Sequence, residues 1–313
     1  MPLKATFDAS LPKSEHVIYM VDSIEKKINT TQQAFPFSIL IPSWNNLSYL
    51  QLCISSIQKN SKRQAQIIVC INEGKDQTRN WIESEGNIDY VYSPSNLGIC
   101  YGLNLCRTLV KSDYIVYMND DMYVLPGWDE KLFADVKMVD TKLFMFSSTM
   151  VEPHDTGNPC VIVKDYGTSI ESFEENRLLH ETEGMSIEHW SGSTWPPNLM
   201  HVDLWDMVGG MSMEFSPGMY SDPDLSMKCY EAGVRIFKGV GDSLVYHFGS
   251  KSTKRVKKNK GKDQFLRKWQ MSARYFTHVI LRRGTVYAKL PENHRMTVGQ
   301  RLLQKIKILK CWI

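Results

Sequence analysis

Between residues 37 and 121 the sequence alternates short apolar runs with segments whose apolar residues recur at helical spacing. The runs are rich in β-branched and aromatic residues, which favours strands, and they are apolar on both faces. Strands of this kind belong to a sheet that helices cover on both sides. The alternation predicts an α/β fold with a mostly parallel central sheet. The predicted strands are Phe37–Ile41, Gln66–Ile71, Ile88–Tyr92 and Asp113–Met118.

Polar residues follow every one of these runs. Ligands of open α/β sheets bind at the carboxyl ends of the strands, so the residues just after the runs predict the site. These residues are Pro42–Asn45, Asn72–Gly74, Ser93–Asn96 and Asn119–Asp121.

The remaining sequence is less regular and suggests three parts. We expect an extension over residues 1–36, one α/β domain over residues 37–250, and a basic loop with a helical extension over residues 251–313. Residues 150–200 have weak periodicity and are interpreted as loops and a small sheet that cover the site. Further predicted elements are helices over His16–Ile28 and Leu225–Gly233 and strands over Leu143–Ser147 and Val234–Phe237.

The triplet Asn119–Asp120–Asp121 ends a hydrophobic strand. Adjacent carboxylates repel each other unless a cation lies between them. Oxygen ligands suit Mg²⁺ or Mn²⁺, which in turn hold diphosphates. The alternative is a solvated turn that caps a helix near Asp129.

A second acidic cluster is Ser221–Asp222–Pro223–Asp224. One carboxylate would cap the helix that begins there, and the other would be available as a general base. His247 comes later, after an apolar run, and is either a core histidine or a metal ligand.

The net charge of +3 conceals an asymmetry. Residues 251–313 carry 18 Lys/Arg and 2 Asp/Glu, whereas the preceding residues carry 19 and 32. A basic end of this kind suggests a polyanionic partner: phosphates, anionic lipid or nucleic acid. The segment Lys251–Lys262 is either a solvated tail or a loop that closes over a diphosphate. Nucleic acid is disfavoured, since aromatics are sparse among the lysines and no recognition motif accompanies them.

Taken in order, these residues resemble the family-2 glycosyltransferases of the GT-A fold. The resemblance covers about residues 37–253 and rests on six motifs, each weak alone. They are FSILIPSWNN (37–46), IIVCINEGKDQT (67–78), SNLGICYGLN (95–104), YIVYMNDDM (114–122), the block 208–236 and HFGSKST (247–253).

The resemblance implies an inverting transfer from a nucleotide-diphosphate sugar. Asp121 and His247 would bind Mn²⁺ or Mg²⁺ at the leaving diphosphate, and Asp222 would take the proton from the acceptor hydroxyl. Asp224 would cap its helix or orient the site. Trp190, Trp195 and His189 lie where the acceptor loop of the family would be. The expected donor contacts, with UDP the favoured nucleotide, are Pro42, Ser43, Asn72, Glu73, Asn96, Gly98, Asn119, Asp120 and Lys251.

Residues 297–313 alternate apolar and basic residues and end in Trp312 and Ile313. Such a segment is typical of a helix that lies in an anionic membrane surface, with a helix packed on the domain as the equal alternative. The expected acceptor is a glycan or a polyprenyl-linked molecule, as the family commonly has, in bacterial surface polysaccharide synthesis.

Two other functions are weighed. A sugar nucleotidyltransferase would show Gly and Lys or Arg after the first strand, and IPSWNN has neither. A non-catalytic sugar- or lipid-binding module would not need Asp121, Asp222 and His247 together. Seven cysteines without a CxxC pair predict reduced thiols. With no secretory signal or membrane-spanning run in the sequence, we expect a cytoplasmic protein, peripheral on the inner face of the cell membrane if residues 297–313 bind lipid.

Overall fold

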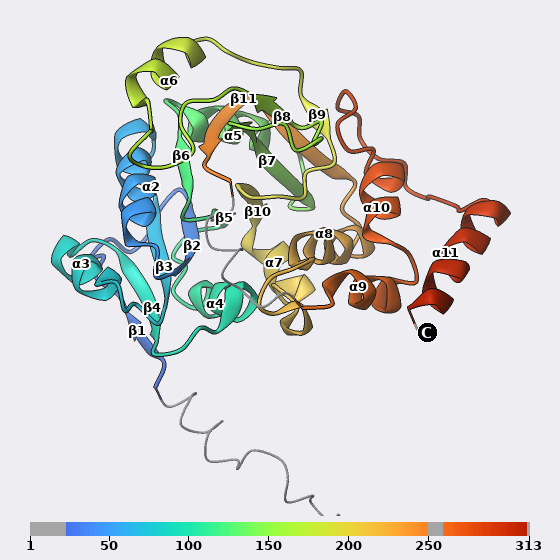
Figure 1. Cartoon of the computed structure of the whole chain (residues 1–313), viewed down its shortest axis with the longest axis horizontal. Helices are drawn as coiled ribbons and strands as arrows, with labels where there is room; N and C mark the ends of the chain where they lie inside the picture. The colour runs from blue at the N-terminus through green and yellow to red at the C-terminus, as the bar shows by residue number, and fades with distance from the viewer. Residues whose placement is uncertain (1–22, 250–258, 312–313) are drawn as a thin grey trace, which may run out of the picture.

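The computed structural model describes residues 23–249 and 259–311. Within these residues the chain builds one mixed sheet with strand order β1-β4-β3-β2-β5-β10-β7-β11-β6, while β8 pairs with β7 and β9 with β11 (Figure 1). The strands are β1 Glu25–Lys27, β2 Ser38–Trp44, β3 Gln66–Asn72, β4 Asp89–Ser93, β5 Tyr114–Tyr117, β6 Met122–Val124, β7 Phe144–Glu152, β8 Val161–Val163, β9 Trp190–Ser191, β10 Asn198–His201 and β11 Ile236–His247.

The four strands predicted from the first apolar runs form the parallel half of the sheet. β4, β3, β2 and β5 lie side by side and are parallel. Successive side chains of a strand point to opposite faces, and in these strands both sets of side chains are buried. In β2, Ile39 and Ile41 face one hydrophobic cluster and Leu40 faces the other. Beyond β5 the sheet is mixed, since β10 is antiparallel to β5 and to β7.

Helices cover both faces of the sheet, as the strand pattern predicts. One cluster contains residues of α2, α3 and α5, and the other contains residues of α4, α7, α8 and α9. The helices are α2 Leu47–Asn60, α3 Thr78–Glu85, α4 Gly98–Arg107, α5 Trp128–Val136, α6 Glu175–Thr182, α7 Val202–Val208, α8 Ser221–Glu231, α9 Gly261–Trp269, α10 Ala273–Tyr275 and α11 Val298–Lys310, with a 3-10 turn at Met213–Phe215 and a π-helix at Phe276–Ile280. The α/β fold class and the helical C-terminal extension are therefore confirmed.

Two predicted elements differ from the structure. Residues 25–27, expected in a helix, form the exposed edge strand β1, whose backbone pairs with β4; residues 16–22 of that prediction lie outside the described part. The strand predicted at Val234–Phe237 and the later apolar run are one strand, β11, which continues through a register shift between Val240 and Leu244. Gly239, Gly241 and Asp242 lie at this irregularity and interrupt the apolar pattern, so the sequence does not indicate one continuous strand.

Helices α9, α10 and α11 follow one another at one side of the molecule, with α11 outermost (Figure 1). No helix of the described residues is long and apolar enough to cross a membrane.

Candidate active site

A cavity of about 810 Å³ opens where β2, β3 and β5 end and where α8 begins. This is the edge of the sheet at which the sequence predicts the site. The predicted residues that line the cavity are Pro42, Ser43, Asn72, Asn96, Gly98, Asn119, Asp120, Asp121, Asp222 and His247.

The loops after the parallel strands form one wall of the cavity and are fixed by short hydrogen bonds. Ser43 Oγ donates to Asp120 Oδ2 at 2.8 Å. Asn72 Oδ1 accepts the backbone N–H of Leu97 at 2.9 Å, and Asn96 Oδ1 accepts that of Gly98 at 2.8 Å. This wall is thus preorganised, with polar side chains and backbone groups presented at the ends of neighbouring strands.

Gly98 lets this wall touch the loop that precedes α8. Its φ is +74°, and a Cβ there would lie 2.5 Å from Ser216 Oγ and 2.8 Å from Pro217 Cα. The residue has to be glycine for both its backbone conformation and the lack of space.

Two predicted donor contacts do not take part in this wall. Glu73 does not line the cavity; its carboxylate accepts from Asn45 Nδ2 at 3.0 Å and pairs with Lys75 at 3.2 Å. Lys251 lies outside the described residues.

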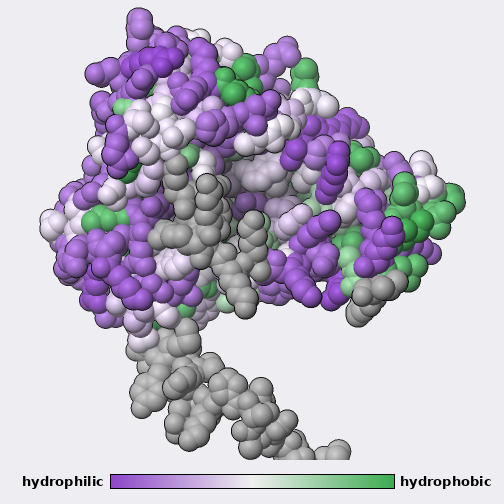
Figure 2. Space-filling model, viewed as in Figure 1, coloured by the Kyte–Doolittle hydropathy of each residue, from purple (hydrophilic) through white to green (hydrophobic). Residues whose placement is uncertain are grey.

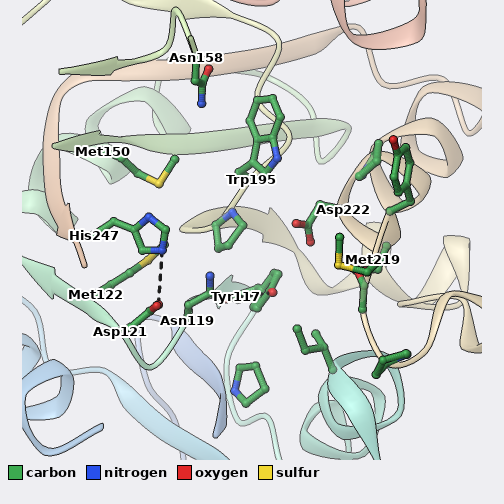
Figure 3. A pocket seen from close by; sticks show the side chains of 18 of the residues that line it. Tyr117, Asn119, Asp121, Met122, Met150, Asn158, Trp195, Met219, Asp222 and His247 are labelled. Atoms are coloured by element: carbon green, nitrogen blue, oxygen red, sulfur yellow. Dashed lines mark hydrogen bonds and ion pairs between the residues drawn. The ribbon is translucent and has the colours of Figure 1, made fainter. Parts of the chain in front are cut away.

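Asp121 and His247 meet in the opposite corner because β6 and β11 are antiparallel neighbours, with His247 paired to Met122. His247 Nε2 lies 3.5 Å from Asp121 Oδ1 (Figure 3). Its other ring nitrogen, Nδ1, lies 2.7 Å from Glu152 Oε1. All three side chains are buried. Burial alone would lower the pKa of His247, but Asp121 and Glu152 outweigh it and raise the pKa to about 10.

Glu152 was not predicted from the sequence. It ends β7, which lies parallel to β11, so the sheet places it beside His247. Its one sequence signal is its position as a carboxylate at the end of an apolar strand. Metal-binding histidines commonly donate their second N–H to a carboxylate, and the Glu152–His247 pair has that arrangement. Within the described residues no group of three His, Cys, Asp or Glu side chains is placed to hold a metal ion by itself.

Asp222 lies in the first turn of α8 and points into the cavity (Figure 3). Its Oδ1 is buried and has no hydrogen-bond partner. Burial raises the pKa of Asp222 to about 7. A carboxylate with such a pKa and an unused oxygen is suited to accept a proton near neutral pH.

Asp224 has a different role from the predicted helix cap. The residue at the cap position of α8 is Tyr220, with a φ of 70° and no side-chain capping bond. Asp224 is fully buried, and its carboxylate accepts from Trp269 Nε1 at 2.7 Å and pairs with Lys268 Nζ at 2.9 Å. The cap prediction is wrong, because long-range partners on α9 satisfy this carboxylate instead.

Of the three residues expected in the acceptor loop, Trp195 lines the cavity. Trp190 is buried: its Nε1 donates to Thr149 Oγ1 at 2.9 Å and its ring lies against Gly239. His189 Nδ1 accepts the backbone N–H of Gly241 at 3.0 Å. Three basic residues that the sequence did not single out, Arg274, His278 and Arg283, also line the cavity.

The sequence of residues 38–189 matches the family described as Glycosyl transferase family 2. No curated protein matches the sequence significantly. Among solved structures, GalNAc-T7 with UDP, GalNAc and Mn²⁺ shares 14% identity over 88% of this chain and 55% of that chain, with a TM-score of 0.54. S. aureus TarS shares 12% identity over 88% and 43%, with a TM-score of 0.52. TarS 1-349 in complex with UDP shares 15% over 67% and 59%, with a TM-score of 0.50.

At these identities the structural likeness establishes the fold, and the chain spans less than two thirds of the length of each neighbour. The fold is that of the GT-A type. Residues 38–189 match family-2 glycosyltransferases, the family that the sequence motifs resemble, and the predicted GT-A fold class is confirmed.

Proposed function

We propose that the protein transfers a glycosyl group from a nucleotide-diphosphate sugar to an acceptor hydroxyl, with inversion at the anomeric carbon. The observation that carries this proposal is Asp222, a carboxylate in the cavity with an unused buried oxygen and a pKa raised to about 7. Asp222 takes the proton of the acceptor hydroxyl as that oxygen forms the new bond to the anomeric carbon and the diphosphate leaves.

Asp121 and His247 are the proposed ligands of Mn²⁺ or Mg²⁺. A carboxylate oxygen and an imidazole nitrogen face each other there at 3.5 Å, and Glu152 orients the histidine. A bound metal would neutralise the charge that develops on the leaving diphosphate. Among the described residues we assign two side chains to the metal, and phosphate oxygens and water would complete its coordination.

The ends of β2, β3 and β5 are the proposed donor site. Asn72 faces the cavity where Glu73 does not, so we assign Asn72 to the ribose or base and Asp120 to the ribose or sugar. UDP is the proposed nucleotide. The structures of TarS 1-349 and GalNAc-T7 contain UDP, which supports this choice by analogy of fold.

The proposed acceptor is a glycan or a polyprenyl-linked molecule of bacterial surface polysaccharide synthesis, reached at the inner face of the cell membrane from the cytoplasm. Helix α11 supports membrane contact because it packs by its polar side. Gln304 is buried and its Oε1 accepts the N–H of Ser272 at 3.0 Å, while Leu302 and Leu309 are 58% and 64% exposed.

Hydrophobic side chains gather over α11 at the right-hand edge of Figure 2. On a helical wheel, Arg301 and Lys305 flank this apolar stripe on one side and Lys310 on the other. An apolar stripe between basic side chains fits an anionic lipid surface. We expect Leu302→Ser/Leu309→Ser to weaken sedimentation with phosphatidylglycerol vesicles at least about 10-fold. Met138→Ser, at an exposed residue outside α11, is the control; equal binding by the double variant and the parent would disprove the contact.

The catalytic proposal is tested by a thermal-shift panel of UDP, GDP, TDP and CMP with Mn²⁺, followed by hydrolysis of the sugar nucleotides of the base that binds. Asp121→Ala should lose the metal-dependent shift. Asp222→Asn should keep nucleotide binding and lose turnover. Asp140→Asn, at an exposed carboxylate, is the matched control. Full turnover by Asp222→Asn would overturn the assignment of the base.

A further inference from the structure

Three basic side chains line the cavity on the wall formed by α10, the π-helix and the loop after it. Arg274 and His278 are four residues apart and so lie on the same side of this helical segment. Arg283 follows a few residues later. All three line the cavity, together with Trp195.

Arg283 is held in place by its neighbours. Its guanidinium lies over the ring of Trp195, 4.7 Å from the centroid. Its Nη2 donates to His278 Nε2 at 3.1 Å, while His278 Nδ1 lies 3.1 Å from the carbonyl oxygen of Arg274. In this arrangement the histidine accepts through Nε2 and is neutral, with its proton on Nδ1, and Arg283 has further N–H groups beside the one that it donates to His278.

No carboxylate balances this group within the described part of the chain. Burial lowers the pKa of His278, and the charges that act on it come from Arg283 and Arg274. Burial and Arg274 also lower the pKa of Arg283, whose Nε is buried without a hydrogen-bond partner. A partly desolvated guanidinium without a carboxylate partner costs free energy that a bound anion would offset.

The position of this group separates it from the proposed diphosphate site. In Figure 3, Trp195 lies on the opposite side of the cavity from Asn119, with Asp222 at the level between them. The metal corner of Asp121 and His247 lies at a third side. A group bound beside Trp195 and Arg283 therefore enters from the side that the donor does not occupy.

We propose that Arg274, His278 and Arg283 form a phosphate-binding subsite for the acceptor, so that the acceptor is a phosphate-bearing molecule. This proposal rests on the proposed function, because the bound molecule is an acceptor only if the protein is a glycosyltransferase. Two guanidinium groups provide forked donors that match phosphate oxygens, and a phosphate can carry enough negative charge to balance both. The face of Trp195 beside them would stack on the sugar or lipid part next to the phosphate.

The phosphate can belong to a lipid carrier or to a soluble phosphorylated glycan, and two probes distinguish these sources. Farnesyl phosphate with farnesol as its uncharged partner represents the first, and glucose 6-phosphate with glucose represents the second. Binding is measured by calorimetry on the full chain with UDP and Mn²⁺ at saturation, so that the donor site is closed to phosphate.

We expect at least one phosphate to bind more tightly than its uncharged partner, and Arg274→Gln to weaken that binding about 10-fold. Arg274 is exposed, so its replacement should not affect folding. Arg283→Lys keeps the positive charge but removes the paired N–H donors of the guanidinium, so it tests whether those donors are needed. Arg282→Gln is the matched control, because Arg282 is exposed and does not line the cavity. Preference for farnesyl phosphate assigns a lipid-linked acceptor, and preference for glucose 6-phosphate a soluble one.

Equal binding of the phosphates and their uncharged partners, or equal binding by Arg274→Gln and the parent, would overturn the subsite. UDP binding should be unchanged in Arg274→Gln. If UDP and Mn²⁺ failed to bind while Arg274-dependent phosphate binding persisted, the proposed donor chemistry would fail and the anion site would stand.

Discussion

Two ends of one cavity contain acidic groups in opposite electrostatic situations. At the corner formed by Asp121, Glu152 and His247, the two carboxylates face the two ring nitrogens, so each carboxylate contacts the imidazole. At the start of α8, Asp222 has one buried oxygen with no partner. The first arrangement places two carboxylates around one imidazole, whose pKa they raise; in the second, burial raises the pKa of the carboxylate itself, which suits proton transfer. The difference teaches that the role of a carboxylate depends on whether a partner accompanies it in the cavity.

The corner can be disturbed through Glu152 without touching either proposed ligand. Glu152→Gln keeps the side-chain shape and removes the charge that orients His247. We expect Mn²⁺ affinity to fall about 10- to 100-fold, as for other carboxylates that support a metal-binding histidine. Titration of the thermal shift with Mn²⁺ at saturating UDP measures it. If Glu152→Gln had the same Mn²⁺ affinity as the parent, the proposal that His247 binds the metal would be contradicted.

The other end can be tested by pH, since only burial sets the pKa of Asp222. A general base acts in its deprotonated form, so kcat/KM should rise with pH and level off above about 7. Below that value we expect a loss of about 10-fold per pH unit. Initial rates from pH 5.5 to 8.5 give the profile. An inflection near pH 4 would mean that Asp222 behaves as a solvated carboxylate.

The smallest expected effect is a change in the thermal stability of Asp222→Asn. An increase in stability would support the view that Asp222 has no stabilising partner. The pKa of Asp222 is raised in the folded state, so its ionisation opposes folding above that pKa and has no effect below the unfolded pKa. Asp222→Asn should therefore raise the Tm at pH 8 by a few degrees, on the scale of about 2–4 °C per kcal/mol, and have a smaller effect at pH 5. Calorimetry at both pH values measures this. A Tm lowered at pH 8 would show that Asp222 has a stabilising partner.

The parallel half of the fold could be predicted because its strands are apolar on both faces and a helix follows β2, β3 and β4. β11 could not, because Gly239, Gly241 and Asp242 interrupt the apolar pattern where the strand bends. Its pairing with β7 and β6 is long-range, and no local signal encodes it.

The candidate site shows the same division. Asp121, Asp222 and His247 could be found because each lies in a motif with a recognisable order. Glu152 and Arg283 lie outside these motifs and reach the cavity only through tertiary packing. Asp224 was misassigned because an acidic residue before a helix indicates a cap, whereas its partner Trp269 is 45 residues away.

The contact at Gly98 constrains how the protein can change over evolution. Because no space remains between residue 98 and Pro217, a larger side chain there would displace both the loop at the donor wall and the loop that leads into α8. Pro217 lies five residues before Asp222, so the position of the first turn of α8 depends on this contact. If the proposed donor wall and the proposed base are correct, a change at this position would affect both of them.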